Sequence, residues 1–219
     1  IKCWVDKETN CSNLNTISKH FPQAKFLFII RDPRSAVTSL TQRATAKLTG
    51  SYPTHLNYIK LVESCIHWRY TMQGIQYFSK RHSASCLKVN FENLLLSPEP
   101  TLRNVFDFIG TSTLSDSIIR SKISRIPYKR TNDYSDDDIM EGKGVSKDPL
   151  NRWKSNLSQS ELDLIVKITS PTAQKLGYKI GNPGKNISFL KILSSIQDRK
   201  TRFKVATKLA YICAFEYLV

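Results

Sequence analysis

The chain has 219 residues, of which 40% are hydrophobic, and carries a formal net charge of +15. This length is enough for one sizeable core, and the excess of Lys and Arg favours an anionic partner such as a nucleotide, a nucleic acid or a membrane surface. No apolar run reaches the roughly 20 residues that span a bilayer, and five scattered cysteines without a Cys-x-x-Cys pair argue against a disulfide framework and a zinc site.

The hydrophobic pattern predicts strands and helices that alternate along the chain. Short apolar runs predict strands at residues 3–5, 26–30 and 87–90. Longer periodic segments predict helices at residues 12–20, 33–47, 55–80 and 98–109, the last stopped by Gly110. On the longest of these helices the expected apolar stripe is Ile59, Val62, Ile66, Tyr70 and Ile75. Strands separated by helices imply an α/β fold with a parallel sheet flanked by helices, which binds ligands at the carboxyl ends of its strands.

An arginine-rich turn at residues 31–34 joins the second predicted strand to the helix that follows it. Asp32 suits the N-cap of that helix, and Pro33 suits its first position, where a missing N–H costs nothing. Arg31 then lies at the carboxyl end of the strand, beside the free amides of the first helical turn. This combination of a cation and free amides favours a phosphate site.

The helix after this turn carries further groups that bind anions. Ser35, Ser39 and Arg43 are spaced four residues apart and therefore share one helical face. With Arg31 they would form a site with several anion donors. The alternative is an ordinary strand-to-helix turn in which Arg31 makes a surface salt bridge.

Residues 124–151 are polar and rich in charge, which predicts a loop. The three Asp residues at 136–138 would point in different directions, so a solvated turn is favoured over a metal site. Gly142 and Gly144 would let the backbone beside Lys143 approach an anion closely. The alternative is a flexible basic loop.

A turn at residues 181–184 separates the C-terminal segment from the rest of the chain. We therefore expect one domain at residues 1–180 and a basic helical extension at 181–219. Residues 188–218 mix basic and apolar side chains, as one or two amphipathic helices would. Docking on its own domain or on a second subunit is the commoner outcome for such a segment, and a membrane surface or a partner helix is the alternative.

Several motifs together resemble sulfotransferases that use 3′-phosphoadenosine 5′-phosphosulfate (PAPS). Residues 21–40, with Arg-Asp-Pro-Arg at 31–34, resemble the motif that binds the 3′-phosphate of this donor. Further resemblances, to a strand with its acidic loop, a helix, an Arg-Trp element and a Leu-Gly-Tyr element, lie at residues 87–95, 97–110, 151–158 and 176–178. They occur in the family's order between residues 4 and 178. The resemblance implies the P-loop NTPase-like sulfotransferase fold, a three-layer sandwich, incomplete here at the N-terminus.

The resemblance also implies roles for single residues. Arg31 and Ser39 match the positions that hold the 3′-phosphate, while Arg43 and Lys143 match phosphate-contacting residues of the tyrosylprotein branch. The implied reaction transfers a sulfuryl group from PAPS, without a metal, to a hydroxyl of a sugar, a tyrosine or a small alcohol. The alternative is a non-catalytic basic module that binds phosphate groups, although a nucleic-acid partner is not expected because the aromatics near Arg31 are strand core.

Residues 4–10 resemble a strand end at which the family places a lysine near the transferring sulfonate. Lys7 matches this lysine and would stabilise the charge that grows on the leaving oxygen. Glu8 and Thr9 depart from the family pattern, and an ordinary surface lysine is the alternative. Neither the family's 5′-phosphosulfate loop nor its base has a match in the sequence. We therefore expect a truncated and inactive fragment, located in the cytoplasm or, because three Asn-x-Ser sequences are present, in the Golgi lumen.

Overall fold

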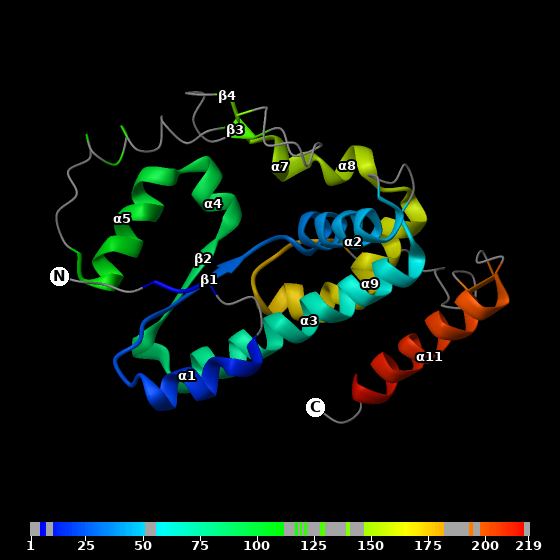
Figure 1. The fold of residues 1–219 in the computed structure, drawn as a ribbon, viewed down its shortest axis with the longest axis horizontal. Coiled ribbons are helices and arrows are strands. Elements are labelled where there is room, and N and C mark those ends of the chain that lie inside the picture. Colours follow the sequence, from blue (N-terminus) through cyan, green and yellow to red (C-terminus); the bar gives the residue numbers. More distant parts are fainter. Residues whose placement is uncertain are drawn as a thin grey trace.

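In the computed structural model the described residues are 5–7, 11–50, 56–111, 117, 119, 121, 128–129, 139–140, 147–181, 193–194 and 198–216. Figure 1 shows their arrangement. The first part of the chain forms η1 (Cys11–Asn13), α1 (Leu14–His20), β1 (Phe26–Ile30), α2 (Pro33–Thr49) and α3 (Tyr58–Arg81). It continues with η2 (Ser83–Ser85), β2 (Cys86–Asn90), α4 (Phe91–Leu96) and α5 (Pro98–Ile109). Then follow β3 (Tyr128–Lys129), β4 (Ile139–Met140), α7 (Asp148–Asn151), α8 (Trp153–Asn156), α9 (Gln159–Lys175) and α11 (Arg199–Glu216).

Strands β1 and β2 pair in parallel, with Phe26 opposite Cys86 and Ile30 opposite Asn90. Helix α3 covers one face of this pair, where the Phe78 ring makes edge contacts with those of Phe26 and Phe28. Helices α4 and α5 contact β2, while Leu27 and Ile29 of β1 are 42% and 55% exposed. The predicted α/β class with a parallel sheet is confirmed. The strand predicted at residues 3–5 falls mostly outside the described residues.

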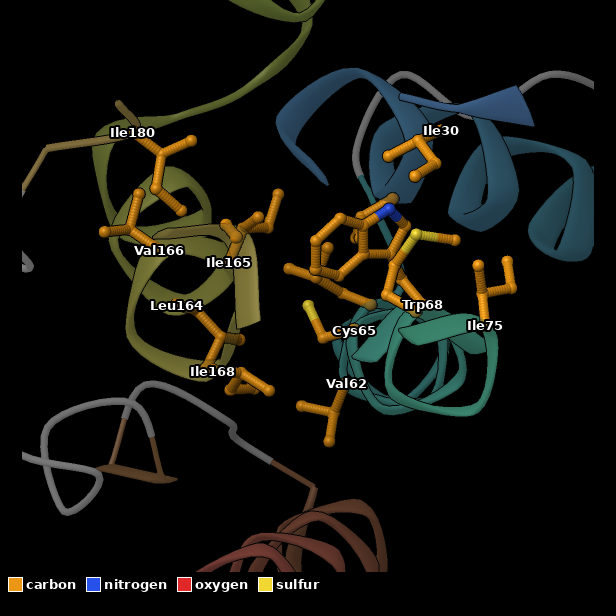
Figure 2. Close-up of a cluster of buried hydrophobic side chains, with 14 of the residues drawn as sticks. Ile30, Val62, Cys65, Trp68, Ile75, Leu164, Ile165, Val166, Ile168 and Ile180 are labelled. Atoms are coloured by element: carbon orange, nitrogen blue, oxygen red, sulfur yellow. The ribbon is translucent and has the colours of Figure 1, made fainter. Parts of the chain in front are cut away.

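The core lies where α3 packs against α2, α9 and β1 (Figure 2). Apolar side chains of α9 face those of α3, and Ile30 of β1 closes the cluster from above. The stripe predicted on α3 is wrong at Tyr70, which is 40% exposed, whereas Trp68 is only 3% exposed. Because α3 packs against several helices, its buried side is wider than one stripe and is centred on Leu61, Val62, Cys65, Trp68, Met72, Ile75 and Phe78.

The segment at residues 124–151, predicted as a loop, contains regular structure. Two short strands, β3 and β4, pair in antiparallel fashion, with Tyr128 opposite Met140. Helix α7 begins at Asp148 with Pro149 in its first turn. Strands of two residues are too short to produce a hydrophobic period, so the sequence pattern did not reveal them.

Candidate anion-binding site

The turn between β1 and α2 is capped as the sequence predicts. Asp32 is the N-cap, and its Oδ1 accepts a hydrogen bond of 2.8 Å from the Arg34 backbone N–H. The Asp32 carboxylate also pairs with the guanidinium of Arg34, with 2.5 Å between Nη2 and Oδ2. That guanidinium lies over the Trp153 ring, 4.5 Å from its centroid. Arg34 is therefore occupied with holding α8 against the start of α2.

Arg31 follows the last residue of β1, and its guanidinium is held from two sides. Nη2 donates a hydrogen bond of 2.9 Å to the Pro149 carbonyl of α7. The guanidinium carbon lies 4.5 Å from the centroid of the Phe91 ring at the start of α4. The backbone carbonyl of Arg31 accepts a hydrogen bond of 3.3 Å from Trp68 Nε1. Fixed rotamers such as this reduce the ordering cost when a ligand binds.

Other arginines lie close enough to Arg31 to act on its charge. Partial burial lowers the pKa of Arg31 most, the charge of Glu92 then raises it, and the weaker effects of Arg152 and Arg43 lower it again. Arg31 forms no ion pair with a carboxylate in the described part of the chain. A half-buried cation that is repelled by two others is stabilised by a bound anion. The electrostatics therefore favour an anionic ligand here.

Glu92 ties this turn to a segment near residue 178. Its Oε1 accepts a hydrogen bond of 2.8 Å from the Asp32 backbone N–H. Its Oε2 accepts one of 2.9 Å from the Tyr178 hydroxyl. Burial, and then the charge and hydrogen bond of Glu92, raise the pKa of Tyr178 above its usual value. Glu92 thus fixes the first amide of the turn, and its charge acts on Arg31 more strongly than that of either Arg152 or Arg43.

The three residues of α2 predicted to bind an anion do not have equivalent roles. Ser35 is buried, and its hydroxyl donates to the Pro149 and Leu150 carbonyls at 3.5 Å, so it faces α7. Ser39 is half-buried, and its hydroxyl has no hydrogen bond to a described residue. Arg43 is exposed and donates one long bond of 3.4 Å from Nε to the Ser39 carbonyl. Ser39 and Arg43 therefore remain available to an anion near Arg31.

Lys7 and Lys143, which the sequence also predicts as site residues, have no described contact with the Arg31 turn. Lys7 is exposed, and among the described residues its one hydrogen bond is donated by its backbone N–H to Asp6 Oδ1 at 2.8 Å. Lys143 lies outside the described residues. Their assignments stay predictions that come from the resemblance alone.

Sequence reasoning missed two contributors to the site. Arg152 was noted only as part of an Arg-Trp element, yet its charge acts on Arg31. Phe91 was noted only within a strand-and-loop motif, yet its ring supports the Arg31 guanidinium. Their proximity in space to residue 31 depends on chain segments about 60 and 120 positions away, which no local pattern encodes.

Comparisons with known proteins place the chain in a family. The model of the sulfotransferase family matches residues 2–116, and the chain belongs to this family. Protein-tyrosine sulfotransferase 1 of Danio rerio is 24% identical over 76% of this chain and 45% of its own length. Protein-tyrosine sulfotransferase A of Caenorhabditis elegans is 28% identical over 72% of this chain and 40% of its own length. The chain thus spans less than half the length of these relatives.

Solved structures support the same fold. The sulfotransferase domain from the curacin biosynthetic pathway superposes with a TM-score of 0.54 over 78% of this chain and 60% of that chain, at 16% identity. The sulfotransferase domain from the Synechococcus PCC 7002 olefin synthase gives the same TM-score over 78% of this chain and 55% of that chain, at 18% identity. The predicted sulfotransferase fold is confirmed.

Proposed function

We propose that this sulfotransferase-family chain binds PAPS as its sulfuryl donor and holds the 3′-phosphate of the donor at the Arg31 site. One observation carries the proposal: the Arg31 guanidinium is fixed between the Phe91 ring and the Pro149 carbonyl at the carboxyl end of a parallel strand, two further arginines act on its charge, and it forms no ion pair with a carboxylate among the described residues. A phosphate dianion satisfies such a cluster through charge-assisted hydrogen bonds. Ser39, Arg43 and Arg152 are the further contacts we propose.

The proposed reaction moves the sulfuryl group in line from the donor to a hydroxyl acceptor. The bond between sulfur and the bridging oxygen of the 5′-phosphate breaks, adenosine 3′,5′-bisphosphate leaves with the bond electrons on that oxygen, a new bond forms between sulfur and the acceptor oxygen, and the acceptor proton passes to water. Negative charge grows on the bridging oxygen, and we propose that the Lys7 ammonium stabilises it there. We propose Lys143 as an additional phosphate contact. Arg31 positions the donor and takes no part in the bond changes.

For the acceptor we propose a protein tyrosine, because the two relatives compared above are named for that activity. Sugars and small alcohols offer the same reacting group, a hydroxyl oxygen. The described residues around Arg31 bear on the donor side only, so the acceptor class depends on these relatives.

Calorimetry with adenosine 3′,5′-bisphosphate tests the donor assignment. This ligand should bind more tightly than 5′-AMP, which lacks the 3′-phosphate. Arg31→Ala should weaken binding of the bisphosphate by about 2–3 kcal/mol, the scale of a charge-assisted contact, which is roughly 30- to 150-fold. The same variant should leave the binding of 5′-AMP nearly unchanged.

Arg81→Ala is the matched control for the loss of one arginine. Arg81 ends α3, and its guanidinium lies over the exposed Tyr77 ring, away from the β1–α2 turn. The control should bind the bisphosphate like the wild type. Equal affinities for the two nucleotides, or equal losses in the two variants, would refute the assignment of Arg31.

A further inference from the structure

Helix α11 has one side that docks on the rest of the protein. Val205 is fully buried and belongs to the main core cluster, with Val62 and Cys65 of α3. Figure 1 shows α11 running beside α3, and α3 also packs against α2. Figure 2 shows the ribbon of α11 beneath Val62 and Ile168. The side of the helix that carries Val205 thus packs against α3, and residues 199, 200, 203 and 204 on its other side are exposed.

The outward side of its first two turns is basic around one aromatic ring. Phe203 is 71% exposed, and Arg199, Lys200, Arg202 and Lys204 are exposed as well. Arg199 and Lys200 precede Phe203 by four and three positions, so they flank it on the same helical face. We call Arg199, Lys200, Phe203 and Lys204 the basic-aromatic patch.

The patch works against the stability of its own helix. Cations in the first turn oppose the helix macrodipole, because the amino end already carries partial positive charge. The exposed ring gains nothing from the core. Neither Arg199, Lys200 nor Lys204 forms an ion pair with a carboxylate in the described part of the protein. These residues do not stabilise the fold, and binding to an external anionic partner would explain their presence.

We propose that the basic-aromatic patch of α11 docks the protein on an anionic membrane surface. Lipid headgroups supply the complementary charge, and the boundary with the acyl chains accepts one aromatic ring. A nucleic-acid groove would present several aromatic side chains for stacking, and a protein interface would present a broader apolar centre. The described outward side offers a single large apolar group among cations, which suits the lipid surface best. No helix in the described ranges is long and apolar enough to cross a bilayer.

The docked orientation would leave the anion site open. Helix α3 separates α11 from α2, the helix that begins at the Arg31 turn (Figure 1). Membrane contact and nucleotide binding therefore use different sides of the protein. Vesicle binding by α11 can therefore be measured whether or not the protein binds PAPS.

Co-sedimentation of the full chain with vesicles tests the proposal. The wild type should bind vesicles of phosphatidylcholine containing about a third phosphatidylserine at about 0.1 M salt, and should bind pure phosphatidylcholine poorly. Each basic residue near an anionic surface contributes about fivefold, so Arg199→Gln/Lys200→Gln/Lys204→Gln should weaken binding at least tenfold. The matched control, Lys19→Gln/Lys47→Gln/Lys80→Gln, removes three exposed lysines elsewhere and should change binding by about twofold or less.

Single substitutions at exposed apolar positions provide a second readout that does not put folding at risk. Phe203→Ala should weaken vesicle binding about threefold or more, because the ring enters the headgroup boundary. Leu48→Ala, at a residue 65% exposed at the end of α2, should have no effect. Circular dichroism checks that each variant keeps its helices.

Three results would each overturn the proposal: no binding of the wild type to the anionic vesicles, equal losses in the two triple variants, or tight binding to a short DNA duplex that depends on the patch while vesicle binding does not.

Discussion

Glu92 holds together two segments of the anion site through its carboxylate. It accepts hydrogen bonds from the first amide of the β1–α2 turn and from the Tyr178 hydroxyl, 86 positions away. Its neighbour Phe91 supports the Arg31 guanidinium. Two consecutive residues therefore position both the backbone and the side chain that would meet a phosphate. This arrangement explains why an acidic residue lies beside a site for anions.

The contact between Tyr178 and Glu92 predicts a pH dependence of stability. Burial and Glu92 raise the pKa of Tyr178, so the folded protein keeps the phenol neutral where the unfolded chain, with an ordinary pKa near 10, begins to ionise. The stabilisation is therefore complete below about pH 10 and is lost as the pH rises above it.

Urea denaturation of wild type and Tyr178→Phe measures this effect. At pH 8 the variant should be less stable by about 1.5–3 kcal/mol, the value of a hydrogen bond to a charged group. The difference should shrink by about 0.8 kcal/mol at pH 10.5, because only the wild type loses stability through this phenol. Tyr77→Phe, at a residue 61% exposed, is the control. A difference that stays constant with pH would contradict the contact.

The sequence predicted those features of single site residues that depend on their neighbours in the chain. Asp32 as N-cap, Pro33 as first helical residue and Arg31 at the strand end follow from neighbouring residues alone. The contact of Arg31 with Phe91, like that of Asp32 with Glu92, joins segments about 60 positions apart. Such pairs depend on how the elements pack, so a single sequence does not specify them.

The bounds of a helix or strand could be predicted where residues next to one another in the sequence define them. The strand at residues 26–30 and the helix at 98–109 have the predicted bounds, because a compact apolar run and a Pro start with a Gly stop define them. The buried face of α3 was not predictable in the same way. It depends on which helices lie beside it, and Trp68 and Met72 are buried there while Tyr70 is not.

Replacement of a glycine by alanine should have opposite effects on stability at two positions in the helices. Gly110 ends α5 with φ of +79°, a backbone conformation that costs a residue with a side chain about 1 kcal/mol. Gly74 lies inside α3, where an added Cβ would meet, among the described residues, the Cys11 Cβ at 3.4 Å, an ordinary contact. Gly110→Ala should therefore destabilise the protein by about 1 kcal/mol, and Gly74→Ala should stabilise it by about 0.5–1 kcal/mol.

Thermal or urea denaturation of the two variants beside the wild type measures both signs in one experiment. Destabilisation by Gly74→Ala would show that α3 and η1 pack more tightly than the described contact allows.

For the whole molecule, four separate sequence motifs meet at one end of the parallel strands. The β1–α2 turn, the Phe91–Glu92 pair, the Arg152–Trp153 pair and Tyr178 make direct or electrostatic contact around the Arg31 turn. The chain belongs to the sulfotransferase family, and we propose that this convergence forms the site for its sulfuryl donor. The sequence predicted the motifs and their order, whereas their meeting in space required the fold.

A crystal structure of the protein with adenosine 3′,5′-bisphosphate would show directly whether Arg31 holds the 3′-phosphate. We expect the 3′-phosphate to lie about 3 Å from the Arg31 guanidinium and the Ser39 hydroxyl, with Arg43 and Arg152 turned toward it. The Phe91 ring and Glu92 should keep their present contacts with the turn. A bisphosphate whose 3′-phosphate lies away from Arg31, for example on the basic-aromatic patch of α11, would contradict the assignment of Arg31 as the residue that holds this phosphate.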